Sequence, residues 1–166
     1  MATRPLGTRM LMKLDVWSVR WTGDSFFMWM FSRRSGFSKD RLLKGRKAPA
    51  LVLVTKGRST GRERSVVLPY FTFDGMTFVV GSKGGAPEDP DWIRNLRQTP
   101  AAIVYIHRRP QSVNVRFARE EERAKLWAQL IDFAPTYDGY QRGTRREIPL
   151  VIIGSGWATP ASSAAA

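Results

Sequence analysis

Two short segments of this sequence hold residues that could bind an anion. The first, residues 56–64, carries four cations and two glycines, with Ser59 and Thr60 between them. Guanidinium groups match the oxygens of phosphate or carboxylate, hydroxyls add hydrogen bonds, and glycine lets a ligand approach the backbone. This composition is typical of an anion-binding loop, and also of an exposed hairpin tip with basic side chains.

The second segment, residues 81–85, reads Gly-Ser-Lys-Gly-Gly. It follows a predicted strand and precedes a predicted helix, so its backbone N–H groups and Lys83 could also hold an anion. Its spacing differs from that of the P-loop. Because both segments follow predicted strands, we expect them to form one shared phosphate site.

Residue types needed for other chemistries are missing. The chain has no cysteine, and His107 is its one histidine. Thiolate metal sites, cysteine nucleophiles and two-histidine metal sites are therefore excluded, and we expect no metal. Asp74, Glu88, Asp89 and Asp91 fall in predicted turns without a catalytic motif. An enzyme built from this chain would hold a redox cofactor that carries the chemistry, and a pure binding module is the alternative.

The formal net charge of +13 is unevenly distributed: +8 in residues 1–49, +5 in residues 50–118 and zero thereafter. Such a field attracts phosphates, whether in nucleic acid, anionic lipid or a phosphorylated cofactor. A basic nucleic-acid-binding module is one reading. The aromatic side chains gather in the N-terminal part and not among the basic loops, where base stacking needs them, so we expect no nucleic-acid partner.

Residues 1–46 combine positive charge with large apolar side chains. Leu14, Trp17 and Trp21 fall on one helical face. The pattern favours either a helix packed on the core or a segment that binds an anionic membrane surface. No window is long and apolar enough to span a bilayer. We therefore expect a cytoplasmic protein, peripheral to the inner face of the cell membrane.

From residue 47 to residue 153 the pattern becomes extended, with short polar connections. Six strands are predicted, at residues 50–55, 65–71, 77–81, 101–107, 112–118 and 148–153, with helices at 91–96 and 120–133. Short connections favour antiparallel hairpins in a meander that curls into a small barrel. Residues 154–166 are small and polar, and predict a disordered tail.

A linked set of residues across residues 47–153 resembles a known family. The set comprises Thr55, Gly57-Arg58, Thr60-Gly61, Arg64, Ser82-Lys83-Gly84-Gly85, Pro90, Trp92, Asn95-Leu96, Pro100, Pro135, Tyr137, Tyr140 and Ile148-Pro149. It is similar to the deazaflavin-dependent nitroreductase family of actinobacteria, which are coenzyme F420-dependent quinone reductases. The resemblance implies an α+β fold with a split β-barrel related to flavin reductases, about six mostly antiparallel strands and flanking helices.

The resemblance also implies roles for individual residues. Arg58, Ser59, Thr60, Arg64 and Lys83 would hold the phosphate and oligoglutamate tail of F420, while Ser82, Gly84 and Gly85 would contact its ring region. Trp92 and Asn95 would fix the basic loop and the side of the cofactor. Tyr70, Tyr137 and Tyr140 would line the face where a quinone or another small planar acceptor binds. An FMN-binding oxidoreductase of the same fold is the alternative.

Overall fold

The structure is a computed structural model, and it describes residues 49–106 and 109–154. The predicted N-terminal segment 1–46, His107 and all but the first residue of the predicted tail lie outside these ranges. Within them, no helix has the length and apolar character needed to cross a bilayer.

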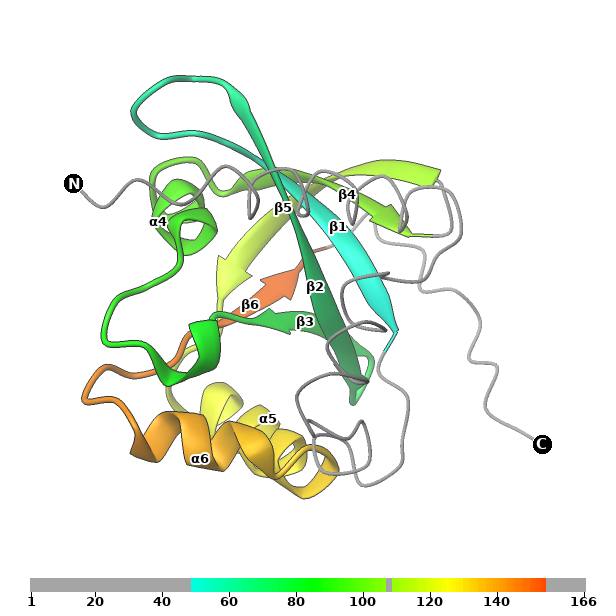
Figure 1. The fold of residues 1–166 in the computed structure, drawn as a ribbon. Helices are drawn as coiled ribbons and strands as arrows, with labels where there is room; N and C mark the ends of the chain where they lie inside the picture. The colour runs from blue at the N-terminus through cyan, green and yellow to red at the C-terminus, as the bar shows by residue number, and fades with distance from the viewer. Residues whose placement is uncertain (1–48, 107–108, 155–166) are drawn as a thin grey trace, which may run out of the picture.

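Six strands close into an antiparallel barrel (Figure 1). They are β1 (Ala50–Lys56), β2 (Glu63–Phe73), β3 (Met76–Val80), β4 (Ala101–Ile106), β5 (Arg109–Phe117) and β6 (Leu150–Ile153). Their order around the barrel is β1-β2-β3-β6-β5-β4, and pairing of β4 with β1 closes it. The split-barrel expectation is confirmed.

The strands do not form the predicted meander. β3 pairs with β6, with Phe78 opposite Ile152, and β4 pairs with β1, with Val104 opposite Leu53. The chain between β3 and β4 contains α4 (Asp91–Gln98), which contacts β1. This helical connection carries the chain past β6. In a meander β4 would pair with β3, whereas here β6 occupies that position.

Side-chain alternation along the strands creates two large apolar clusters and a third, small one around Val52 and Val54. All six strands contribute to an interior cluster, which α4 joins through Trp92, Ile93 and Leu96. An outer cluster, which includes Phe71 and Phe78, packs against α5 (Glu120–Phe133) and α6 (Thr136–Arg142). Figure 1 shows α5 and α6 together on one side of the barrel, away from α4. The helices therefore cover two separate parts of the barrel.

The helices agree in part with the sequence. α5 has the predicted bounds, and α4 begins at the predicted residue and continues two residues past the predicted end. The helix α6 and the single-turn 3₁₀ helix η1 (Lys83–Gly85) were not predicted. Both are short and contain glycine, which weakens a helical pattern.

Gly81 lies at the end of β3 in a position too crowded for a side chain. A Cβ there would lie 2.8 Å from Cγ of Pro149 and 2.9 Å from Cδ1 of the fully buried Ile93. We expect Gly81→Ala to lower the free energy of unfolding by about 1–3 kcal/mol in urea titrations. Gly139→Ala in α6 is the control. Its Cβ would meet nothing within 4 Å, so the alanine should leave stability unchanged or raise it slightly.

Candidate functional site

The basic loop between β1 and β2 is a compact turn built around Gly57. The carbonyl of Gly57 accepts hydrogen bonds from the amides of Thr60 at 3.2 Å and Gly61 at 2.7 Å, and its own amide donates to the carbonyl of Arg62 at 2.8 Å. A Cβ on Gly57 would lie 3.0 Å from that carbonyl oxygen. The side chains of Arg58, Ser59, Thr60 and Arg64 are exposed around this closed backbone.

Asn95 of α4 fixes the basic loop through hydrogen bonds. Its Oδ1 accepts a hydrogen bond from the amide of Arg58 at 3.1 Å, and its Nδ2 donates to Oγ1 of Thr55 at 3.1 Å. The side chain is 3% exposed, so its amide is held among protein partners. Asn95 thus positions the basic loop. Trp92, on the same helix, packs into the interior cluster and anchors α4.

The glycine loop after β3 has an unusual backbone. Lys83, Gly84 and Gly85 have φ angles of 49°, 67° and 80°, in the left-handed region that glycine tolerates best. A Cβ on Gly84 would meet nothing within 4 Å, whereas a Cβ on Gly85 would lie 2.9 Å from the carbonyl oxygen of Tyr140 in α6. One face of the loop is therefore open, and the other is pressed against α6.

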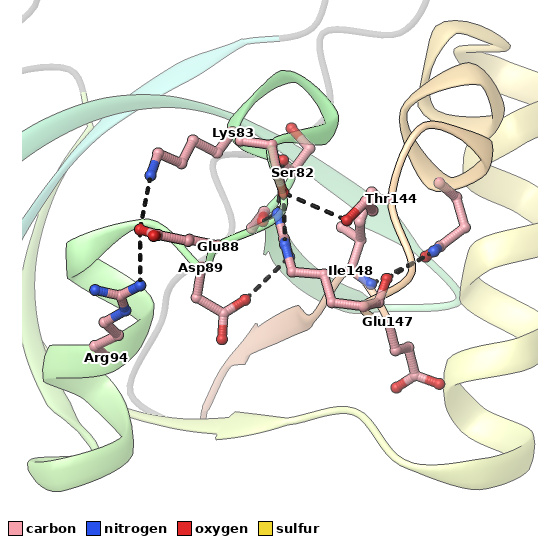
Figure 2. Close-up of polar contacts among 12 residues, drawn as sticks. Ser82, Lys83, Glu88, Asp89, Arg94, Thr144, Glu147 and Ile148 are labelled. Atoms are coloured by element: carbon pink, nitrogen blue, oxygen red, sulfur yellow. Dashed lines mark hydrogen bonds and ion pairs between the residues drawn. The ribbon is translucent and has the colours of Figure 1, made fainter.

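Arg146 holds the glycine loop in this conformation. Its guanidinium donates to the carbonyls of Gly81 at 3.0 Å, Ser82 at 2.8 Å and Ala86 at 2.9 Å, and to the Asp89 carboxylate at 3.0 Å. The Arg146 and Asp89 side chains are only 14% and 12% exposed. Figure 2 shows Ser82 and Asp89 among the residues joined by these polar contacts. Sequence reasoning missed Arg146, since an arginine between Arg145 and Glu147 resembles any exposed charged turn.

Each of the two loops places one cation against the segment 88–91 at the start of α4, although the strands that lead into the loops are not neighbours. Arg58 of the basic loop contacts Asp91 at 3.2 Å, and Lys83 of the glycine loop contacts Glu88 at 3.9 Å. Ser82, Gly84 and Gly85 lie in the same loop as Lys83. One cation from each loop expected to hold the cofactor therefore lies within ion-pair distance of the segment 88–91.

The three tyrosines do not share one face. Tyr137 and Tyr140 pack edge to face with ring centroids 5.7 Å apart, and Phe71 meets Tyr137 at the same separation. Tyr70 precedes Phe71 on β2 and therefore points the opposite way, into the interior cluster. This corrects the expectation of a three-tyrosine face. Tyr137 is buried, Tyr140 is half-buried, and the backbone of Tyr140 lies against Gly85.

Burial sets the protonation state of these phenols. It raises the pKa of Tyr140, and it raises that of Tyr137 further because Tyr137 is enclosed and lies against Tyr140. Both hydroxyls therefore remain protonated at every pH below the ordinary phenol value of 10.0. They can donate hydrogen bonds to an acceptor oxygen, and neither serves as a general base.

A cavity of about 810 Å³ lies between the end of α4, β5 and residues 146–149, and Asp89 and Arg146, which support the glycine loop, line part of it. Three of its lining arginines are engaged within the protein: Arg97 pairs with Asp89 at 2.8 Å, Arg116 forms a two-pronged pair with Glu122, and Arg146 bonds to the glycine loop. No residue expected to bind the cofactor or the acceptor lines this cavity. The converging loops, and not this cavity, constitute the candidate site.

Comparison with known proteins assigns the chain to a family. The sequence profile of the F420H(2)-dependent quinone reductase family matches residues 26–154, more than half of the chain. The chain belongs to this family. It is an F420-dependent oxidoreductase, and coenzyme F420 is its cofactor.

Individual relatives support the assignment. An F420H(2)-dependent quinone reductase of Mycobacterium tuberculosis is 31% identical over 109 residues, which cover 63% of this chain and 72% of that protein. The solved structure of an F420-H2 dependent reductase superposes with a TM-score of 0.57 at 30% identity, over 66% of this chain and 100% of that chain. A structure described as a domain-swapped dimer has a TM-score of 0.58 at 27% identity, over 78% and 100%.

We expect Arg146→Lys to destabilise the protein although it preserves the charge. Lysine cannot reproduce the planar fork, so buried carbonyls of the glycine loop and part of the Asp89 pair lose their donors. The free energy of unfolding should fall by about 2 kcal/mol or more. Arg145→Lys, at the exposed neighbouring position, should change it by less than about 0.5 kcal/mol. Equal effects of the two substitutions in urea titrations would contradict this role.

Proposed function

We propose that this protein transfers a hydride from reduced F420 to a planar, quinone-like acceptor. The observation that carries the proposal is the convergence of two cation-bearing loops at one helix end, with one loop pressed against a tyrosine-bearing helix. The family assignment supports reduction of a quinone-like acceptor. When bound, the reduced deazaflavin ring would supply two electrons as a hydride.

The residues present fit the charged portion of this cofactor. F420 of the family carries a phosphate and an oligoglutamate tail, and Arg58, Arg64 and Lys83 offer guanidinium and ammonium donors suited to both groups. Hydroxyls of Ser59, Thr60 and Ser82 stand on the same loops. Gly84 leaves open space for a ligand above its Cα. FMN, which lacks the polyanionic tail, would use fewer of these cations.

The acceptor side is proposed to lie at α6. The partly exposed phenol of Tyr140 would donate a hydrogen bond to the acceptor oxygen, where negative charge develops as the hydride arrives. Tyr137 would hold the ring of Tyr140 from behind through their edge-to-face contact. Because Gly85 touches the backbone of Tyr140, the cofactor loop and the acceptor side are kept at a constant separation.

We also propose that residues 1–46 bind the inner face of the cell membrane, where lipophilic quinones reside. The support is the sequence pattern, in which Trp17, Trp21 and Trp29 are flanked by Arg20, Arg33 and Arg34. Indole and guanidinium groups favour the headgroup zone of a bilayer.

Cofactor and acceptor roles should separate in a binding and turnover experiment. Arg64→Ala or Lys83→Ala removes a charge-assisted hydrogen bond, and each should weaken F420 binding about tenfold or more, with a loss that shrinks at high salt. Tyr140→Phe should lower menadione turnover while leaving F420 affinity within about twofold. Fluorescence titration with F420, with FMN as a comparison ligand, measures the first, and steady-state rates measure the second.

The placement of F420 at the two loops and of the acceptor at α6 would be wrong if Tyr140→Phe weakened F420 binding as much as Lys83→Ala does. F420 binding that is unaffected in both charge variants would remove the two loops from the site. Tighter binding of FMN than of F420 would contradict the proposed cofactor contacts.

The membrane proposal can be tested in the full-length chain. Each basic residue near an anionic surface contributes about 1 kcal/mol, so Arg33→Gln with Arg34→Gln should reduce partitioning onto phosphatidylserine vesicles about thirtyfold. A matched loss of charge on the barrel, Arg109→Gln with Arg119→Gln, should have a much smaller effect. Cosedimentation measures both. Equal losses would show that binding follows total charge, without a dedicated N-terminal segment.

A further inference from the structure

Five charged side chains of alternating sign connect the basic loop to the glycine loop. Successive contacts are Arg58 to Asp91 at 3.2 Å, Asp91 to Arg94 at 4.0 Å, Arg94 to Glu88 at 3.2 Å and Glu88 to Lys83 at 3.9 Å. Figure 2 shows the contacts from Lys83 to Glu88 and from Glu88 to Arg94 as dashed lines. The two end members are cations expected to bind the cofactor, and the middle members have no assigned role. We call these five residues the charge bridge.

Exposure indicates that the contacts of the charge bridge can be exchanged. Its three cations are 35–36% exposed, and its two carboxylates 66–70%. Ion pairs so open to water contribute about 0–1 kcal/mol each, so another anion can displace them at little cost. The Asp89–Arg146 pair, at 12% and 14%, is enclosed and permanent by contrast. Exposure thus divides the acidic residues here into one structural carboxylate and two exchangeable ones.

We propose that Glu88 and Asp91 hold Lys83 and Arg58 in the free protein and compete with the cofactor's anionic groups for them. Arg94 touches both carboxylates, so it compensates their charge when the end cations turn to the ligand. This inference rests on the proposed function. Under this proposal the Glu88 carboxylate lowers the affinity for the cofactor. The Arg94 guanidinium raises that affinity without contacting the ligand.

Charge counting explains the role of Arg94. With three cations and two carboxylates the charge bridge carries a net charge of +1. Without Arg94, ligand binding would take both remaining cations away from two carboxylates and leave these facing the anion. Without Glu88, Lys83 is available before the ligand arrives. Substitutions at these two positions should therefore act in opposite directions and offset each other.

A double-mutant cycle tests the proposal through F420 affinity, measured by fluorescence titration. Glu88→Gln should tighten binding about two- to fivefold, and Arg94→Gln should weaken it by a similar factor. The double variant should return to within about twofold of the unsubstituted protein. Weaker binding by Glu88→Gln would overturn the proposal, since the carboxylate would then be orienting Lys83. A double variant as weak as Arg94→Gln alone would also overturn it, because Arg94 would then contact the ligand.

Two further measurements establish whether the exchange is local and whether it depends on F420. Glu122→Gln removes the same charge from the pair with Arg116, away from both loops, and should change affinity by less than Glu88→Gln does; equal changes would overturn the local competition. Thermal shift with inorganic pyrophosphate repeats the cycle without F420. If F420 fails to bind but pyrophosphate gives the expected order of variants, the exchange stands and the proposed function falls. If F420 binds and supports turnover but neither probe gives that order, the exchange alone falls.

Discussion

The guanidinium of Arg146 is the interaction on which the site depends most directly. The three consecutive residues at positive φ form one 3₁₀ turn, in which the amide of Gly85 donates to the carbonyl of Ser82 at 3.0 Å. The inward carbonyls of Gly81, Ser82 and Ala86 also meet a side-chain donor. Arg146 supplies that donor to three carbonyls and the Asp89 carboxylate from a largely buried position. The stiffness of the glycine loop therefore originates beyond the loop itself, in the segment just before β6.

Asn95 does for the basic loop what Arg146 does for the glycine loop, with a neutral amide in place of a charge. Each is a largely buried polar side chain that bonds to main-chain groups of the loop it supports. The consequence is a division of labour. Buried polar groups determine where the loops lie, and the exposed cations on those loops remain available to a ligand.

Local patterns predicted the elements well and their arrangement less well. The apolar runs of β1 and β6 and the acidic first turn of α5 are visible within a few residues, because local structure leaves a local pattern in the sequence. The pairing of β3 with β6 leaves no such trace, since it depends on which strand covers an apolar face after the chain has crossed the barrel. The role of Arg146 was not predicted for the same reason. Its carbonyl partner Gly81 is 65 residues away, and nothing in its neighbours indicates burial. The exposed loops of the site could be recognised from composition, whereas the charge bridge needed the fold.

The contact between Gly85 and the backbone of Tyr140 has an evolutionary consequence. Neither segment can drift alone, because a larger residue at Gly85 or a shifted α6 would force the other to move. A substitution that enlarges or moves α6 at this contact therefore requires a change in the glycine loop as well. The glycine loop and α6 are structurally coupled, and a chimaera between two family members should exchange them together.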